Sequence, residues 1–167
     1  MADSWGGTAG SLGRWQAYVN AWVLSENDTH ATIRCQAFFH SINWGFDVYG
    51  NGTAYVDGEG AYSGTVTMYS PYGGTVTQLV ATKDLTVAKG GSGRNVWCSA
   101  TINVTGGYEN GSSSAGVNVW VGQRAYYQPH PPRDCSLQRV SDTQQRIKWS
   151  PDCTGMDGGY PWAGVYV

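Results

Sequence analysis

Short runs in which apolar and polar residues alternate recur along the chain, and they constrain its fold more than any other feature. The clearest run spans residues 15–24, where one side carries Trp15, Ala17, Val19, Ala21 and Val23. Successive side chains of a β-strand point to opposite faces, so this pattern predicts a strand with one buried face. No run has helical periodicity, and the abundance of Thr, Val, Tyr, Trp and Gly is typical of strands and tight turns.

The alternating runs follow one another at spacings of about 8–12 residues, which is typical of an all-β sandwich or barrel. We therefore expect an antiparallel β-sandwich or jelly roll over residues 14–128. Asn51-Gly52 predicts a hairpin turn between two of its strands. The expected strands cover residues 15–24, 30–39, 44–49, 53–57, 61–69, 75–82, 84–88, 94–104 and 116–122.

Both ends of the chain differ from this central domain. Residues 1–13 are rich in Gly and Ser, which predicts a flexible N-terminal arm. Pro129-His130-Pro131-Pro132 separates the domain from residues 129–167, where strand patterns cover 137–141, 144–150 and 162–167. Three strands cannot close the core of a sandwich. The sequence therefore predicts an incomplete second β-module and a longer, modular protein.

Residues 131–167 resemble the beginning of a fibronectin type III domain. The matching residues are Pro131-Pro132 at the entry, Leu137 in the first strand, Ile147-Lys148-Trp149 in the second, and Trp162 with Val165–Val167 in the third. Trp149 stands where that family has its buried Trp, whereas the later strands and the family's Tyr are absent. The resemblance implies a binding or spacer module and not an enzyme.

The last strand pattern, Pro161-Trp162-Ala163-Gly164 followed by Val-Tyr-Val, is similar to strands in large tail-associated proteins of phages and prophages of Gram-positive bacteria. This resemblance implies a virion protein. The first residues contain neither a basic segment nor an apolar segment, so no secretory signal is visible, although the composition is typical of extracellular domains. A virion protein is made in the host cytoplasm and leaves by lysis, which reconciles the two observations; a secreted protein whose signal has been removed is the alternative.

The four cysteines are too few for a disulfide-rich scaffold. Cys35 and Cys98 each alternate with core residues, so they are either two buried free thiols or an inter-sheet disulfide. Cys135 and Cys153 lie in the second module and offer a second possible disulfide. Their spacing fits no zinc site, so we expect no metal.

Residues capable of chemistry are sparse, and we expect a protein that is not an enzyme and holds no cofactor. Asp57 and Glu59 have same-face spacing but sit in an Asp-Gly-Glu-Gly turn, and His30, His40 and His130 are isolated in the sequence. The formal net charge of -2 predicts no binding to nucleic acid. The absence of a long apolar run predicts no insertion into a membrane.

Four large aromatic side chains fall on faces that are otherwise polar. Tyr18 and Trp22 alternate with Gln16 and Asn20, Trp97 shares a side with Asn95, Ser99 and Thr101, and Trp120 shares one with Asn118. Three interpretations of these four rings remain open: a subunit or domain interface, a carbohydrate platform, or ordinary burial.

The expected function is that of a virion structural and adhesion protein, tail-associated, which contacts sister subunits or other virion proteins and presents modules to glycans on the host surface. The alternative is a carbohydrate-binding module of a secreted protein that acts on polysaccharides or cell walls.

Overall fold

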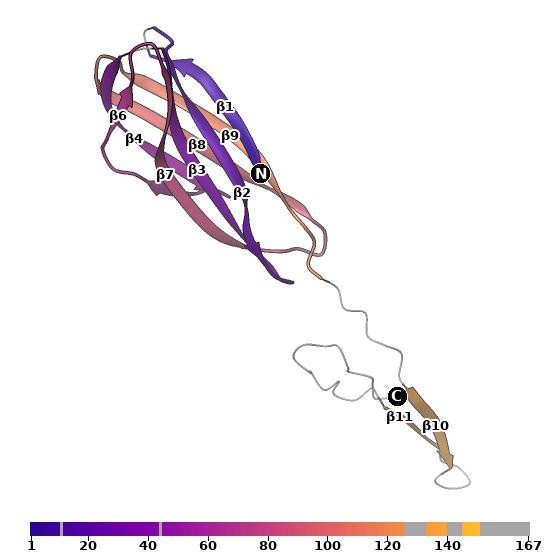
Figure 1. Ribbon diagram of the computed structural model, residues 1–167. Helices are drawn as coiled ribbons and strands as arrows, with labels where there is room; N and C mark the ends of the chain where they lie inside the picture. The colour runs from indigo at the N-terminus through magenta and orange to yellow at the C-terminus, as the bar shows by residue number, and fades with distance from the viewer. Residues whose placement is uncertain (11, 44, 126–132, 140–144, 151–167) are drawn as a thin grey trace. The chain divides into compact units, whose positions relative to one another are not determined.

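The computed structural model describes residues 1–125, apart from residues 11 and 44, and the strands over residues 133–139 and 145–150. The chain divides into two units, Met1–Ala125 and Tyr126–Val167, so the division comes a few residues before the boundary expected at residue 129. The described residues form strands, turns and bends and include no helix (Figure 1).

The first unit is an antiparallel β-sandwich of two sheets. The first sheet has the strand order β1-β2-β3-β7 and the second has the order β5-β4-β8-β9, with β6 paired to the first half of β4. The all-β sandwich predicted from the alternation is therefore confirmed. The strands are β1 (Ala2–Ala9), β2 (Trp15–Glu26), β3 (His30–Ile42), β4 (Phe46–Val56), β5 (Glu59–Tyr62), β6 (Val66–Ser70), β7 (Thr75–Ala88), β8 (Arg94–Gly107) and β9 (Gly111–Val121).

The core lies between the sheets and consists of the inward-facing half of each alternating run. On β2 every second residue from Trp15 to Ala21 is fully buried, as the sequence predicts. Successive residues of a strand point to opposite faces, so when every second residue is buried in the core, the residues between them lie on the outer surface of the sheet. The largest fully buried side chains are Trp15, Phe39, Ile33, Met68, Ile102, Val19, Val48, Val56, Val96 and Val121.

The hairpin predicted at Asn51-Gly52 is wrong, because β4 runs straight through both residues. Its glycines serve close packing instead of a turn: a Cβ atom on Gly50 would lie 2.1 Å from the backbone oxygen of Asn103. A Cβ atom on Gly52 would lie 2.6 Å from Val80 Cγ1, which belongs to the opposite sheet. The hairpin lies later, at Asp57-Gly58, where both residues have positive φ angles of 52° and 88°.

Two further strand boundaries differ from the predicted ones. The expected strand over 61–69 is divided between β5 and β6, which pair with the two halves of β4. Conversely, the two strands expected at 75–82 and 84–88 form the single strand β7. A bulge at Val80 accommodates the irregular alternation of β7, and Lys83 pairs in register with Cys35 of β3.

The flexible arm predicted for residues 1–13 is wrong for residues 2–9, which form β1 and pair with β2. Two of its residues, Ala2 and Ala9, pack against the core. The glycines that suggested flexibility permit a close approach to β9 instead, because a Cβ atom on Gly6 would lie 2.5 Å from the backbone oxygen of Ser114.

Side chains connect the edges of the two sheets. Ser113 Oγ of β9 accepts a hydrogen bond from the backbone N–H of Ala17 at 2.9 Å and donates one to the carbonyl oxygen of Gly7 at 2.7 Å. At the opposite edge, Gln78 of β7 bonds to the β6 backbone, donating to Thr67 O and accepting from Tyr69 N–H. Both edges of the sandwich are thereby held by polar groups whose partners are backbone atoms.

Replacing Ser113 with Ala is expected to destabilise the sandwich, because it removes the partner of two backbone groups at once. The Ala17 N–H is buried, and leaving a buried backbone group unpaired costs about 1–3 kcal/mol in the free energy of unfolding. Urea denaturation measures the loss, and Ser112→Ala is the matched control because Ser112 is exposed on the same strand. Equal stabilities for the two variants would show that Ser113 does not hold this edge.

The second unit contains β10 (Arg133–Arg139) and β11 (Gln145–Ser150), which pair antiparallel with Leu137 opposite Ile147. Strands are thus present at the first two expected positions. The expected third strand over 162–167, the proline segment at 129–132 and the position of Cys153 lie outside the described residues. The fibronectin type III resemblance stays a prediction.

Candidate functional site

An apolar row crosses the outer face of the first sheet. Its members are in register on all four strands: Trp5 pairs with Tyr18, Tyr18 with Phe38, and Phe38 with Leu79. We call these four residues the apolar row. The core-facing residues of β2 and β3 are the odd-numbered neighbours, so the backbone alternation itself places Tyr18 and Phe38 outside.

The rings of the apolar row contact one another. The ring centroids of Trp5 and Tyr18 are 4.2 Å apart, and those of Tyr18 and Phe38 are 5.5 Å apart. His40 adds an edge-on contact to Trp5, with centroids 4.6 Å apart. Such aromatic pairs contribute about 0.5–1.5 kcal/mol beyond their buried area, so neighbouring strands hold the rings in place before any partner arrives.

Polar atoms beside the row fix two of its rings. The hydroxyl of Tyr18 donates to Asp3 Oδ2 at 3.1 Å, and burial followed by this hydrogen bond raises the pKa of Tyr18. His40 Nδ1 lies 2.8 Å from Thr77 Oγ1, and burial lowers the pKa of the imidazole. His40 is therefore neutral at pH 7, because its ordinary pKa is about 6.5.

The row nevertheless presents large apolar groups to solvent. Trp5 is 51% exposed and Leu79 is 48% exposed, whereas Tyr18 and Phe38 between them are half-buried. Contiguous exposed apolar groups are typical of interaction surfaces, so the apolar row is a candidate binding surface.

A second row runs parallel to the first and is polar. Asp3 pairs with Asn20, Asn20 with Gln36, and Gln36 with Thr82. This polar row places two amide groups, a carboxylate and a hydroxyl beside the rings, with the Oδ1 atom of Asn20 buried. One row further along, Trp22 pairs with Arg34, whose guanidinium forms a bidentate ion pair with Asp84 (Nε–Oδ1 2.8 Å, Nη2–Oδ2 2.6 Å).

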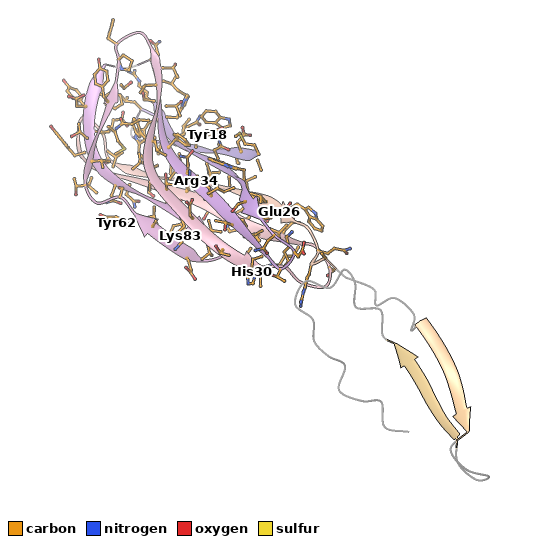
Figure 2. All side chains as sticks on the ribbon, turned by 60° about the horizontal axis from the view of Figure 1, so that its bottom comes forward. Tyr18, Glu26, His30, Arg34, Tyr62 and Lys83 are labelled. Carbon is orange, nitrogen blue, oxygen red and sulfur yellow. The ribbon has the colours of Figure 1, made fainter. Side chains whose placement is uncertain are left out.

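The four predicted aromatic residues do not form one platform. Tyr18 and Trp22 lie on the outer face of the first sheet, while Trp97 and Trp120 lie on the outer face of the second. In Figure 2, Tyr18 and Arg34 come from neighbouring strands of the first sheet, whereas Tyr62 comes from β5 of the second. The sequence therefore identified rings that point outward, but it could not assign them to opposite sides of the sandwich.

Glycines hold the two tryptophans of the second sheet. Trp97 lies over Gly116, where a Cβ atom would meet Cζ2 of the indole at 2.1 Å, and Trp120 lies over Gly93 in the same way at 2.2 Å. Trp97 and Trp120 nevertheless remain 53% and 62% exposed. Each ring lies diagonally across to the neighbouring strand, and the two rings extend in opposite directions along the strands. They therefore offer separate contacts.

Three members of the apolar row were not predicted from the sequence. Trp5 lay in the segment expected to be flexible, and Leu79 lies beside the bulge, where simple alternation fails. Phe38 was detectable, because it alternates onto the same side as Gln36 and His40. The register in which the strands pair brings Trp5, Phe38 and Leu79 together, and a local sequence pattern does not reveal that register.

The two cysteines of the first unit are buried free thiols, so the disulfide alternative for Cys35 and Cys98 is not formed. Cys35 Sγ donates a weak hydrogen bond to Ser99 O at 3.6 Å. Hydrogen bonding to Cys98, together with burial, raises the pKa of the Cys35 thiol above its ordinary value. The proposed pairing of Cys135 with Cys153 lies outside the described residues, since Cys153 and the side chain of Cys135 are not described.

We expect Cys35 and Cys98 to resist alkylation in the native protein, because both side chains are fully buried away from the reagent. Cys35 is in addition kept protonated, and only a thiolate reacts. Iodoacetamide at about pH 8, just below the ordinary thiol pKa of about 8.5, should modify both residues only after unfolding in guanidinium chloride. Peptide mapping by mass spectrometry follows each residue. Rapid native labelling of Cys35, or a peptide pair joined through Cys35 and Cys98, would contradict this prediction.

The acidic residues of the predicted turn form surface ion pairs with different strands. Asp57 Oδ2 lies 3.0 Å from Arg94 Nη2, and Glu59 Oε2 lies 3.2 Å from Lys83 Nζ. Within the described part of the chain, no three His, Cys, Asp or Glu residues gather where one metal ion could bind. The same residues contain no helix long and apolar enough to cross a membrane.

Comparison with known proteins found no matching family model, no similar curated protein and no similar solved structure. The site must therefore be interpreted from its own geometry.

Proposed function

We propose that the protein is a non-enzymatic structural and adhesion protein of a virion, associated with the tail. The apolar row on the first sheet is the surface that contacts sister subunits or other virion proteins. The observation that carries this proposal is the continuous register of Trp5, Tyr18, Phe38 and Leu79 across all four strands.

The shape and chemistry of the row support a protein partner. Its rings are already packed against one another, so binding orders few side chains and loses little conformational entropy. Tryptophan and tyrosine are enriched among the residues that dominate the binding energy of protein interfaces. Many modest contacts of this kind gain strength when subunits are repeated in one particle.

The placement in a virion rests on the resemblance of residues 131–167 to modules of phage tail-associated proteins. The apolar row gives the first unit a role in such a particle, as a contact surface. In this arrangement the sandwich joins the particle, and the following modules extend toward glycans on the host surface.

The polar row favours a second candidate function, a carbohydrate-binding module of a secreted protein that acts on polysaccharides or cell walls. Gln36 carries an amide group directly beside the rings of Tyr18 and Phe38. Amides hydrogen-bond to sugar hydroxyls, while an aromatic face attracts the C–H edges of a pyranose ring.

Sedimentation velocity of the full chain, combined with a glycan array, separates the two candidates. The virion proposal predicts a defined oligomer at micromolar concentrations, which dissociates when Leu79 is replaced with Asp at the exposed end of the row. A monomer that binds a neutral glycan through the same face would favour the carbohydrate-binding module. A monomer that binds no glycan would contradict both.

A further inference from the structure

The dipeptide Asn-Gly occurs twice in the sequence, at Asn51-Gly52 and at Asn110-Gly111. Its chemistry is particular, because the backbone nitrogen after an asparagine can attack the carbonyl carbon of the asparagine side chain. Glycine has no side chain that would hinder this attack. The attack also requires that the amide group and the nitrogen are free to approach each other. The fold therefore decides which of the two dipeptides can react.

Asn51-Gly52 is held at both reacting groups. The side-chain oxygen of Asn51 accepts a hydrogen bond from Asn103 Nδ2 at 3.2 Å, and the backbone nitrogen of Gly52 donates one to Ser63 Oγ at 2.9 Å. The dipeptide also lies inside β4, which is paired on one side with β8 and on the other with β5 and β6. Strands in such central positions open rarely, so the two groups seldom meet.

Asn110-Gly111 lies in a different environment. Asn110 is exposed and belongs to no strand, because β8 ends at Gly107 and β9 begins at Gly111. Within the part of the chain that the structure describes, the side chain of Asn110 makes no hydrogen bond. Connections between strands are more mobile than the strands themselves. The amide group of Asn110 is therefore free to turn toward the nitrogen of Gly111.

The backbone requires a glycine directly after Asn110. Gly111 has a φ angle of 141°, which residues with a Cβ atom rarely adopt. It is exposed and pairs with Val104 as the first residue of β9. The connection from β8 to β9 is thus built on the residue that leaves the backbone nitrogen unshielded by a side chain. The reactive dipeptide is a consequence of this geometry.

We propose that Asn110 is a site of spontaneous deamidation. The nitrogen of Gly111 forms a bond to Cγ of Asn110, the bond from Cγ to Nδ2 breaks, and the amide group leaves as ammonia with the proton from the Gly111 nitrogen. The product is a cyclic imide, which then takes up one water molecule at either of its two carbonyl carbons. Hydrolysis at one carbonyl gives aspartate, and hydrolysis at the other gives isoaspartate, in which the chain continues through the side chain.

The modification changes both the charge and the spacing of the chain where β9 begins. Either product carries a new carboxylate beside the buried Glu109. Isoaspartate also lengthens the backbone by one methylene group, three residues before Ser113, which bonds to the backbone of Ala17 and Gly7. The modification therefore adds negative charge next to the edge that Ser113 holds. It does not depend on the function proposed for the apolar row.

The two dipeptides serve as each other's controls in a single experiment. The full chain is incubated at mildly alkaline pH, natively and in concentrated urea, and peptide mass spectrometry follows the conversion of each asparagine. We expect Asn110 to convert at least about tenfold faster than Asn51 in the native protein, because β4 must first open locally for Asn51 to react. In urea the two rates should become similar. In the variant Asn110→Gln, enzymatic methylation of isoaspartate should detect much less product than in the unmodified chain.

Three results would overturn the proposal. These are equal native rates for Asn51 and Asn110, conversion of Asn110 only after unfolding, and an unchanged yield of isoaspartate in Asn110→Gln. A difference between the two sites that persists undiminished in urea would attribute the selectivity to the local sequence and would overturn its explanation by the fold. None of these outcomes involves Trp5 or Leu79, so the proposed function is tested separately.

Discussion

Replacing Gly50 with Ala should destabilise the sandwich severely. The new Cβ atom would lie 2.1 Å from the backbone oxygen of Asn103, 2.8 Å from Met68 Cε and 2.9 Å from Val104 Cα. The first and third of these atoms belong to the backbone of β8 and cannot move without separating β4 from β8, two adjacent strands of the second sheet. Overpacking a core usually costs about 1–3 kcal/mol, and a clash with backbone belongs at or above the upper end of that range.

Gly106→Ala is the matched control for this substitution. Gly106 lies on β8 and pairs with Tyr49 beside Gly50, and a Cβ atom added to it would have no neighbour within 4 Å. Thermal unfolding followed by circular dichroism should therefore show a large loss for Gly50→Ala and a small change for Gly106→Ala. Similar unfolding temperatures for the two variants would contradict the close approach of β4 and β8.

Replacing Trp5 with Ala should abolish most of the assembly that the apolar row supports. Trp5 is the largest residue of the row, is 51% exposed, and stacks on Tyr18, so its contact area with a partner is both large and rigid. Interface residues of this type contribute about 2 kcal/mol or more, which corresponds to a loss of roughly 30-fold in affinity. Sedimentation equilibrium measures the association constant directly.

Two further variants separate binding from folding in this experiment. Trp97 has a nearly equal exposed fraction of 53% but lies on the other sheet, so Trp97→Ala should assemble like the unmodified protein. Trp5→Phe keeps a ring against Tyr18 and should retain an intermediate affinity. Equal losses in Trp5→Ala and Trp97→Ala would mean that the first sheet is not the specific contact face.

The sequence predicted the fold class and the inward faces well, for a physical reason. Alternation is local, and each inward set on β2, β3 and β8 follows from it without knowledge of any partner strand. The prediction of a turn at Asn51-Gly52 was wrong because glycine favours both tight turns and close packing between strands. Which of the two occurs depends on the neighbouring strand, which the local sequence does not show. The prediction of a flexible N-terminal arm was wrong for a similar reason, because Gly6 allows a close approach to β9 and does not indicate flexibility.

The candidate site was less predictable than the fold. Tyr18, Trp22, Trp97 and Trp120 alternate with polar residues in the sequence, but their distribution over two sheets depends on topology. Trp5 and Leu79 join the row through pairing registers that include two irregularities, one after Trp5 and one at Val80.

Hydroxyl-radical footprinting of the tryptophans tests the central claim most directly, because Trp5 and Trp97 start from nearly equal exposure on opposite sheets. The protein is oxidised in its assembled and dispersed states, and each residue is quantified by mass spectrometry. If the apolar row is the assembly surface, Trp5 will be strongly protected in the assembled state while Trp97 is oxidised at an unchanged rate. Oxidation of Trp5 at the same rate in both states would contradict the proposed function.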